Sequence, residues 1–359
     1  MSVPPAENSL SRMLIKAKAV QERTDLQELR EQGYTAVDMH VHTRFSDSFT
    51  SIRKLLAKAR RKGIGVAITD HNQIEGVLRA KSYDNDVLVI PGIEVSTSEG
   101  PHILLYFYNV KELESFYRRY VQHAKNKNPH STTYLGVQDL IRASKAYRCV
   151  VSVAHPFGPV YANVGNGIKR GMLESNLFDE TDAIEAINGA MTKRSNAKAI
   201  ECAESNNMAI TGGSDSHALY EFGHILTCVK AGTVKEFLDG VKGRRSLVRG
   251  CPMGKVRRAP SLAKLSGKHM QYAVPMFPQQ YEQIIARPYR YHKAAFKSKL
   301  KVTMDTLREE GIDILKHPQR LPRVVYKPAS IFVKGALVRT LKPRRHRRIK
   351  INNTLTNSR

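Results

Sequence analysis

The chain has 359 residues, 41% of them hydrophobic, which is enough for one large domain or two ordinary ones with a real core. No apolar run reaches the roughly 18 residues that a membrane-spanning helix needs, and the four cysteines are scattered, which excludes a disulfide framework or a zinc ribbon. The first residues lack a charged stretch followed by an apolar one, so we expect no secretory signal and a cytoplasmic protein.

The formal net charge of +26 is distributed very unevenly. Residues 1–240 hold 29 Lys and Arg against 27 Asp and Glu, whereas residues 241–359 hold 29 against 5. The sequence therefore predicts two parts of different electrostatic character, with a boundary near "LDGVKGRRSLVRG".

The N-terminal part is predicted to be helical. Residues 8–32 contain few helix breakers, and their apolar positions recur three or four residues apart. Gly33 is expected to end the helix. Residues 1–33 are thus interpreted as an N-terminal helical extension.

Residues 34–240 alternate between strand-like and helix-like segments. The strand-like segments are short runs rich in Val and Ile: "TAVDMHVHT", "IGVAITDH", "VLVIPGIEVST", "HILLYFY", "CVVSVAHP", "DAIEAING", "MAITGGSDSH" and "HILTCV". Several are almost continuously apolar, as strands covered on both faces are. Segments such as "SIRKLLAKARRKG" and "KRSNAKAIECAESNN" are expected to be helices between them. This alternation predicts an α/β domain, with a closed barrel as its expected form.

Residues 241–359 are interpreted as a strongly basic C-terminal extension, partly helical or disordered. Two helices broken at Pro288 are expected within residues 279–311, and a disordered basic tail over residues 342–359.

Polar residues collect where the predicted strands end. His40 and His42 are two apart on one strand, so both rings point the same way and form a chelating pair. The full set at strand ends is His40, His42, Asp47, Asp70, His71, Glu94, His102, His155, Asp215 and His217. Imidazole and carboxylate together suit Zn, Mn or Fe. Taken alone, Asp70 and Asp215 could equally be helix N-caps.

Seven motifs in order resemble the PHP (polymerase and histidinol phosphatase) family of metal-dependent phosphoesterases. They are "DMHVHTRFSD", "AITDHNQIEG", "IPGIEVST", "HILLYF", "AHPF", "IEAING" and "GGSDSH", and they cover roughly residues 35–230. The resemblance implies a distorted (β/α)7-type barrel that holds two or three divalent metal ions, either Mn, Fe or Zn.

Position by position, the resemblance implies three groups of metal ligands. The first is His40, His42, Glu94 and Asp215; the second is Glu94 as a bridge with His102 and His155; the third is Asp47, His71 and His217. The chain departs from the family at Ser48, where relatives often have glycine, and after "AHPF", where some have arginine. These departures concern substrate identity more than metal binding.

The expected reaction is hydrolysis of a phosphomonoester of a small metabolite or nucleotide, or of a terminal phosphodiester, by a metal-activated hydroxide. Asp47, His71, Asp215 and His217 are the expected catalytic residues. Asp70 is expected to orient a ligand by a hydrogen bond, and Asp38 either does the same or is structural.

Phosphate contacts outside the metals should come mostly from cations, because arginine can bind phosphate through two hydrogen bonds. The candidates for substrate binding are Arg44, Lys169, Arg170, Asn188, Lys193 and Arg194. The alternative is that each charged residue of this set is an ordinary solvated loop residue.

The basic extension leaves several functions open. Nucleic acid is one expected partner, since tyrosines lie among the charges in "ARPYRYHK" and could stack on bases. An anionic membrane surface and a tail with no specific role are the others. Three functions thus compete: a small-molecule phosphoesterase, a nuclease that trims RNA or DNA ends, and a nucleic-acid- or membrane-binding protein whose barrel is a scaffold.

Overall fold

The computed structural model describes residues 15, 17–22, 25–83, 86–126, 128, 130–158, 163–254, 256–261 and 263. The helices and the basic tail expected within residues 279–311 and 342–359 lie outside these residues. No helix in the described part of the chain is both long and apolar enough to span a membrane.

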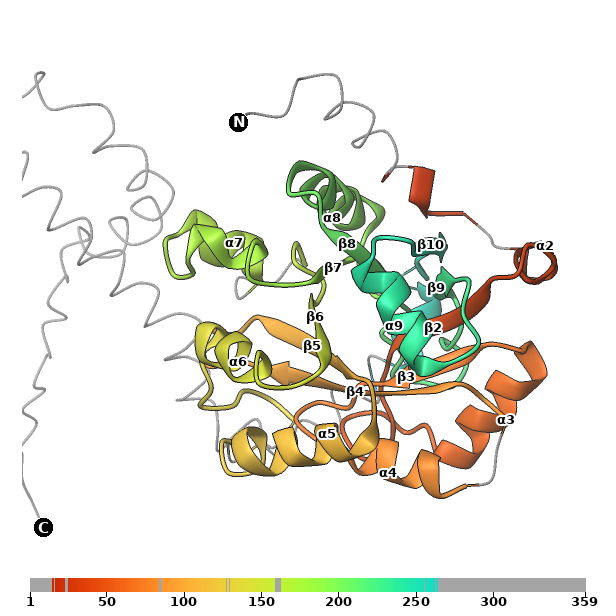
Figure 1. Cartoon of the computed structure of the whole chain (residues 1–359), viewed down its shortest axis with the longest axis horizontal. Helices are drawn as coiled ribbons and strands as arrows, with labels where there is room; N and C mark the ends of the chain where they lie inside the picture. The colour runs from red at the N-terminus through yellow and green to blue at the C-terminus, as the bar shows by residue number, and fades with distance from the viewer. Residues whose placement is uncertain are drawn as a thin grey trace, which may run out of the picture. The chain divides into compact units, whose positions relative to one another are not determined.

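One sheet of ten strands organises the described residues (Figure 1). Its order is β1-β10-β9-β2-β3-β4-β5-β6-β7-β8. All eight predicted strand segments are confirmed, as β2 to β9. The strands are β1 (Ala19–Val20), β2 (Thr35–Val41), β3 (Gly65–Ile68), β4 (Val89–Ser96), β5 (His102–Phe107), β6 (Cys149–Val153), β7 (Ala183–Asn188), β8 (Ala209–Gly213), β9 (Ile225–Val229) and β10 (Leu247–Gly250).

The sheet curls into a nearly closed barrel because the end of β8 returns to β2. Val41 and Ser216 form a parallel bridge. The N–H of Asp215 donates to the carbonyl of His40 at 2.8 Å, and the N–H of His42 donates to the carbonyl of Ser216 at 3.1 Å. Glycine is required at 213, since a Cβ there would lie 2.3 Å from the backbone nitrogen of His40.

The barrel is distorted because not every strand is parallel to its neighbours. The pairs β2–β3, β3–β4, β6–β7 and β7–β8 are parallel, as in a regular β/α barrel. The strand β5 runs antiparallel to both β4 and β6, and β9 runs antiparallel to β2. The expected distorted α/β barrel is confirmed.

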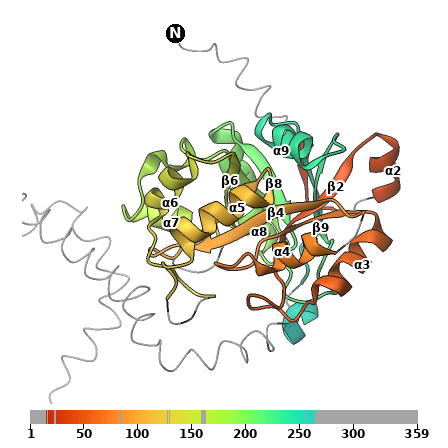
Figure 2. The ribbon, with the colours of Figure 1, turned by 60° about the horizontal axis from the view of Figure 1, so that its bottom comes forward.

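Helices surround the strands (Figures 1 and 2). They are α2 (Leu26–Glu31), α3 (Ile52–Lys62), α4 (Glu75–Ser82), α5 (Val110–Phe116), the π-helical η1 (Tyr117–Val121), α6 (Val137–Ser144), α7 (Val164–Lys169), the 3₁₀ turn η2 (Ser175–Phe178), α8 (Lys193–Ser205) and α9 (Val234–Lys242). The helices predicted over residues 51–63 and 193–207 correspond to α3 and α8.

Local sequence explains the bounds of α3. The side chain of Ser51 accepts a hydrogen bond from the N–H of Lys54 at the start of the helix, and Gly63 ends it in the left-handed conformation. Its buried residues include Leu55 and Ala59, which join the core between sheet and helices. Burying this apolar face against the sheet is the main source of the helix's stability.

A second apolar cluster fills the barrel interior. Strand residues such as Val37, Met39 and Ala183 pack there with Phe237 and Leu238 of α9. Because these strand residues precede the C-terminal ends of β2 and β7, the cluster leaves those ends for polar side chains.

The expected continuous helix over residues 8–32 is wrong for the part that the structure describes. Ala19 and Val20 form β1, which pairs in parallel with β10. The side chain of Asp25 then accepts hydrogen bonds from the N–H groups of Gln27 and Glu28 and starts α2 as a separate helix. The apolar periodicity could not reveal this break, since it depends on a strand more than 200 residues away.

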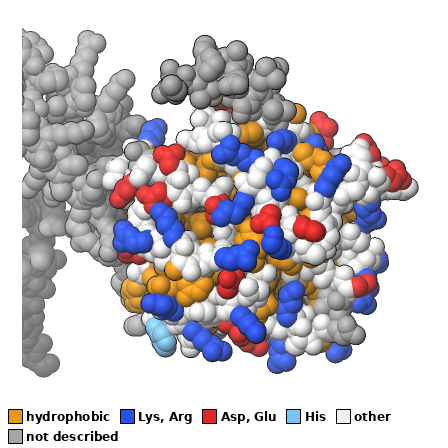
Figure 3. All heavy atoms as spheres, viewed as in Figure 1, with side chains coloured by type: hydrophobic (Ala, Val, Ile, Leu, Met, Phe, Trp, Pro, Cys, Tyr) orange, Lys and Arg blue, Asp and Glu red, His pale blue; other side chains and the backbone are white. Residues whose placement is uncertain are grey.

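The sheet extends past both bounds of the predicted barrel domain, since β1 precedes residue 34 and β10 follows residue 240. Charges of both signs are interspersed on the face of the described residues that Figure 3 shows. This mixture agrees with the near balance of charge in residues 1–240.

Candidate metal centre

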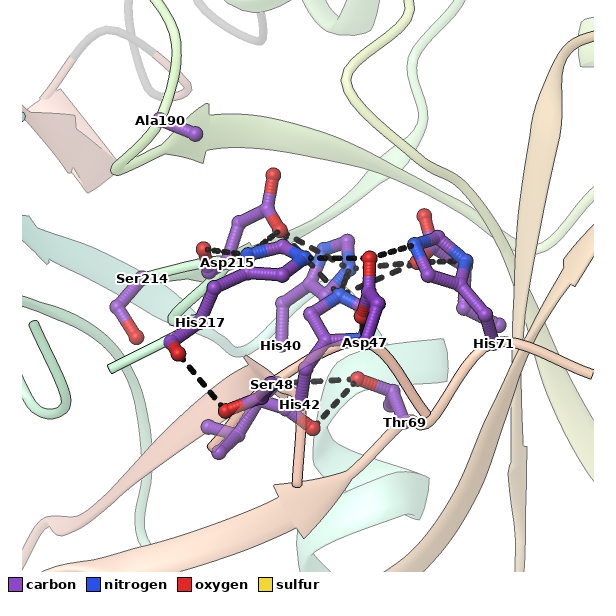
Figure 4. A network of polar contacts seen from close by, with 12 residues as sticks. His40, His42, Asp47, Ser48, Thr69, His71, Ala190, Ser214, Asp215 and His217 are labelled. Carbon is purple, nitrogen blue, oxygen red and sulfur yellow. Dashed lines mark hydrogen bonds and ion pairs between the residues drawn. The ribbon is translucent and has the colours of Figure 1, made fainter. Parts of the chain in front are cut away.

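The structure brings all nine predicted metal ligands together. Figure 4 shows part of this cluster, with His40, His42, Asp47, His71, Asp215 and His217 labelled. Eight come from the C-terminal part of a strand or from the loop that follows it, and His102 is the first residue of the antiparallel strand β5. Residues far apart in the sequence thus become neighbours, as the rings of His42 and His217 do. Three overlapping groups have donor atoms within 4.8 Å of one another: His42, Asp47, His71 and His217; His40, His42 and Glu94; and His71, Glu94 and His102.

Glu94 is the centre of the cluster, and its side chain is fully buried. Its Oε2 lies 3.1 Å from His40 Nε2, 3.3 Å from His42 Nε2 and 3.1 Å from His71 Nδ1. Its Oε1 lies 2.9 Å from His102 Nδ1 and 3.2 Å from His155 Nε2. One carboxylate thus faces five imidazoles.

The second ring nitrogen of His40 is held by a residue that the sequence pattern did not single out. His40 Nδ1 donates to Oε1 of Glu185 at 2.9 Å, and both side chains are buried. This bond places a proton on Nδ1, so Nε2, which faces Glu94 and Asp215, is the ring atom that a metal would take. A carboxylate behind an imidazole in this way is the usual support of a histidine metal ligand.

Asp47 joins the group on the other side of His42. Its Oδ2 lies 3.2 Å from His217 Nε2 and 3.6 Å from His71 Nε2. Its Oδ1 lies 3.8 Å from His42 Nδ1. The loop after β2 therefore folds back over the strand end.

Asp215 occupies a strained backbone position, with φ of +49°. Its Oδ1 lies 3.3 Å from His42 Nε2, and its Oδ2 accepts a hydrogen bond of 3.3 Å from the amide of Asn188. The same amide donates to Glu185 at 2.9 Å. Asn188 therefore orients two carboxylates of the cluster, and its own side chain is fully buried.

Asp70 and Asp38 lie behind the ligands. Asp70 accepts hydrogen bonds from the N–H and hydroxyl of Thr43 and from the hydroxyl of Ser46, at 2.6–2.7 Å. It thereby fixes the loop between His42 and Asp47. Asp38 accepts from the N–H and hydroxyl of Ser214, at 2.8 and 2.5 Å, next to Asp215. Among the helices that the structure describes, neither Asp70 nor Asp215 is an N-cap, and α4, which follows Asp70, begins after Ile74.

The close packing of charges changes the pKa values of the cluster. Burial alone would raise the pKa of Glu94, but the imidazoles of His71, His40 and His102 hold it well below its usual range. Burial likewise favours a higher pKa for Asp215, and His40, His42 and His217 lower it well below the usual value. Both carboxylates are therefore ionised at neutral pH and available as ligands.

The pKa values of His71 and His217 are shifted in opposite directions. Burial lowers the pKa of His71 to about 3, despite the attraction of Glu94 and Asp47. Burial also opposes a charge on His217, but Asp47 and Asp215 raise the pKa of that ring to about 9. At neutral pH the metal-free cluster therefore contains both protonated and neutral imidazoles.

The donor set fits divalent metal ions. Glu94 Oε2 and His42 Nδ1 are buried and make no hydrogen bond, which is unfavourable for polar atoms. Cations bound to these atoms would satisfy them. Neutral imidazole and carboxylate are ligands for Zn, Mn and Fe.

The charged residues predicted to bind substrate lie nearer the surface. Arg44 is exposed, on the loop that carries Asp47, and its guanidinium lies 5.6 Å from the ring centre of Phe45. Lys169 is exposed at the end of α7, and Arg170 follows it. Lys193 and Arg194 are exposed in the first turn of α8.

Two protein-family models match this part of the chain. The model of the PHP domain matches residues 38–203, and that of a PHP-associated region matches residues 193–246. An uncharacterized protein of Methanocaldococcus jannaschii is 28% identical over 166 residues, which cover 42% of this chain and 80% of the relative.

Two solved structures that match this chain have low sequence identity and TM-scores below 0.5. One is a protein from Bifidobacterium adolescentis that is named a predicted metal-dependent phosphoesterase. It is 19% identical, with a TM-score of 0.40 over 62% of this chain and 98% of that one. The lesion-specific endonuclease PfuEndoQ from Pyrococcus furiosus is 18% identical, with a TM-score of 0.47 over 60% of this chain and 57% of that one.

Proposed function

Because residues 38–203 match the PHP domain and residues 193–246 match a PHP-associated region, we propose that the chain is a metal-dependent phosphoesterase. It would hydrolyse phosphomonoesters of small metabolites or nucleotides, with two or three divalent metal ions held by the nine clustered ligands. The observation that carries this proposal is the buried Glu94 carboxylate facing five imidazoles. Such an arrangement is costly without cations and is typical of a multinuclear site.

When bound, the metal ions would supply an activated water and neutralise charge on the phosphoryl oxygens. The chain's own residues set the geometry. Glu94 faces ligands of both halves of the cluster, so it is the proposed bridge. Asp47, His71, His217 and Asp215 are the proposed catalytic residues, because they surround His42 at the side of the cluster that the loop after β2 covers.

Arg44 is the first candidate for phosphate binding, since it is exposed on the same loop as Asp47. Lys169, Arg170, Lys193 and Arg194 are weaker candidates, as they lie at helix ends. Asn188 is better explained as a support for Glu185 and Asp215 than as a substrate contact, because both its amide and its carbonyl are used within the protein.

The test is metal content by elemental analysis beside phosphate release from a panel of phosphomonoesters with added Mn²⁺. Asp215→Ala and His42→Ala should lose metal and at least about 100-fold in turnover, since both remove direct ligands. His123→Ala alters an exposed histidine and should match wild type. Wild-type protein without metal, or turnover that survives both substitutions, would refute the proposal.

A nuclease that trims RNA or DNA ends is the second candidate. The observation that favours it is the excess of 29 Lys and Arg over 5 Asp and Glu in residues 241–359. Polynucleotide hydrolysis by the full chain should then fall steeply with salt, because each phosphate contact releases counterions. Phosphate release from a mononucleotide by the same protein should depend on salt much less.

A further inference from the structure

A short segment beyond the last strand packs on the loop that carries two of the metal ligands. Residues 256–261 are helical and lie outside both regions matched by the family comparisons. Arg258 and Ser261 of this segment are buried, with exposed fractions of 7% and 4%. Arg257 is exposed, and so is Val256. One face of the segment is therefore docked.

The docked face meets Glu221, which is itself buried. Arg258 Nε donates to Glu221 Oε1 at 3.1 Å, and the hydroxyl of Ser261 donates to the same oxygen. The other oxygen of Glu221 accepts the N–H of His217 at 2.8 Å and that of Ala218 at 3.1 Å. Glu221 thus links the segment directly to the backbone of a metal ligand.

Arg258 also reaches the second ligand. Its Nη2 donates to the backbone carbonyl of Asp215 at 3.2 Å. The same carbonyl accepts a hydrogen bond from Nδ1 of His217 at 3.1 Å. This bond keeps the proton of neutral His217 on Nδ1 and leaves Nε2 directed at Asp47, 3.2 Å away.

The loop needs such support because Asp215 is held in the left-handed region, with φ of +49°. A strained conformation of this kind persists only where surrounding contacts enforce it. Arg258 is the residue that binds both ends of the strained segment, at the Asp215 carbonyl and, through Glu221, at the His217 N–H.

We propose that Arg258 is a positioning residue of the metal centre, so that the first turns of the basic C-terminal extension form part of the active site. It acts through Glu221 and the Asp215 carbonyl, and it orients Asp215 and His217 toward the metals. The inference rests on the proposed metal-dependent function and goes beyond it, because it assigns a role to a segment outside the matched domain.

The experiment compares full-length wild type with Arg258→Gln and Arg258→Lys, and with Arg257→Gln as the exposed neighbouring control. Mn²⁺ affinity is measured by competition with a chelator, and the stability of the metal-free protein by urea unfolding. Arg258→Gln should weaken the affinity of the most affected ion about 10- to 100-fold, as loss of ligand support does elsewhere. Arg258→Lys should recover part of this loss, and Arg257→Gln should match wild type.

Turnover adds a second distinction. Misplaced ligands should lower kcat for a phosphomonoester more than they change KM. If Arg258→Gln lowers only the stability of the metal-free protein and the folded fraction binds Mn²⁺ as wild type does, Arg258 is a structural ion pair and the inference is wrong. Should Arg258→Gln fail to fold, Ser261→Ala, which removes one hydroxyl from Glu221, must weaken Mn²⁺ binding for the inference to stand.

Failure of the proposed function gives a different result. Wild type that binds Mn²⁺ without hydrolysing phosphomonoesters would refute the proposed reaction and leave the affinity comparison valid. Wild type that binds no Mn²⁺ would refute both.

Discussion

Glu185 stands directly behind His40, with its Oε1 2.9 Å from His40 Nδ1 and its Oε2 accepting the N–H of His155 at 2.8 Å. One carboxylate of β7 therefore supports two of the proposed ligands, the ring of His40 on β2 and the backbone of His155 after β6. His155 has φ of +26°, so its backbone also depends on such contacts.

Glu185→Gln should weaken metal binding without removing a ligand. The amide cannot accept the His40 and His155 protons on both of its terminal atoms, so His40 loses its preferred orientation. We expect metal affinity to fall about 10- to 100-fold. Chelator competition measures this, with Glu201→Gln on the exposed surface of α8 as the control. Unchanged affinity in Glu185→Gln would contradict the support role.

Asp47→Asn should remove metal from one side of the cluster only. Asp47 faces His42, His71 and His217, whereas Glu94 faces His102 and His155 at the other side. We expect elemental analysis to show fewer ions per chain than in wild type, but not zero, and turnover to fall at least about 100-fold. Loss of all metal would indicate one indivisible cluster.

Gly213→Ala should disturb both the barrel closure and the site. The new Cβ would lie 2.3 Å from the backbone nitrogen of His40 and 2.4 Å from its Cβ. We expect a loss of roughly 3 kcal/mol or more in the free energy of unfolding, because backbone cannot move aside as a flexible side chain can. Urea unfolding measures it. Gly254→Ala, whose Cβ would meet nothing within 4 Å, is the matched control.

Metal binding should release protons and strengthen as pH rises. In the metal-free protein the pKa of His217 is raised to about 9, by Asp47 and Asp215 acting against burial, so the ring is protonated at pH 7. A metal must displace that proton, and apparent affinity should rise by up to about tenfold per pH unit until roughly pH 9. Calorimetry in buffers of different ionisation enthalpy detects the released proton, and His217→Ala should release fewer.

The metal-free protein should show the opposite trend in stability. A histidine whose pKa is raised on folding stabilises the folded state fully below its ordinary pKa of roughly 6.5. That contribution is lost as pH rises through the folded value, about 9 for His217. In chelator-treated protein, the difference in thermal midpoint between wild type and His217→Ala should therefore shrink as pH rises across this range.

Much of the fold and of the proposed ligand set could be predicted, because the type of each residue and its position along the predicted strands both indicate the same role. Buried strands need Val and Ile, and histidines at the ends of several such strands converge when the sheet closes. His40 and His42 are therefore recognisable from the amino-acid sequence alone.

Other residues could not be recognised because their roles depend on tertiary contacts. Glu185 lies within β7. Its apolar neighbours Ile184 and Ala186, both buried, are the one sequence signal that its carboxylate must also have a buried partner. Arg258 is one cation in a region rich in them. The break between β1 and α2 depends on β10, which forms near the other end of the described chain.

The bridge between Val41 and Ser216 has a consequence for the order of events in the cell. A growing chain that has emerged only to residue 213 carries every proposed ligand except Asp215 and His217, yet its barrel has no closing seam. The imidazoles would then lie on a sheet that has not closed into a barrel, and Arg258 would not yet have been synthesised. Loading of the centre is therefore expected to be a late step, completed only after synthesis has passed the start of the basic extension.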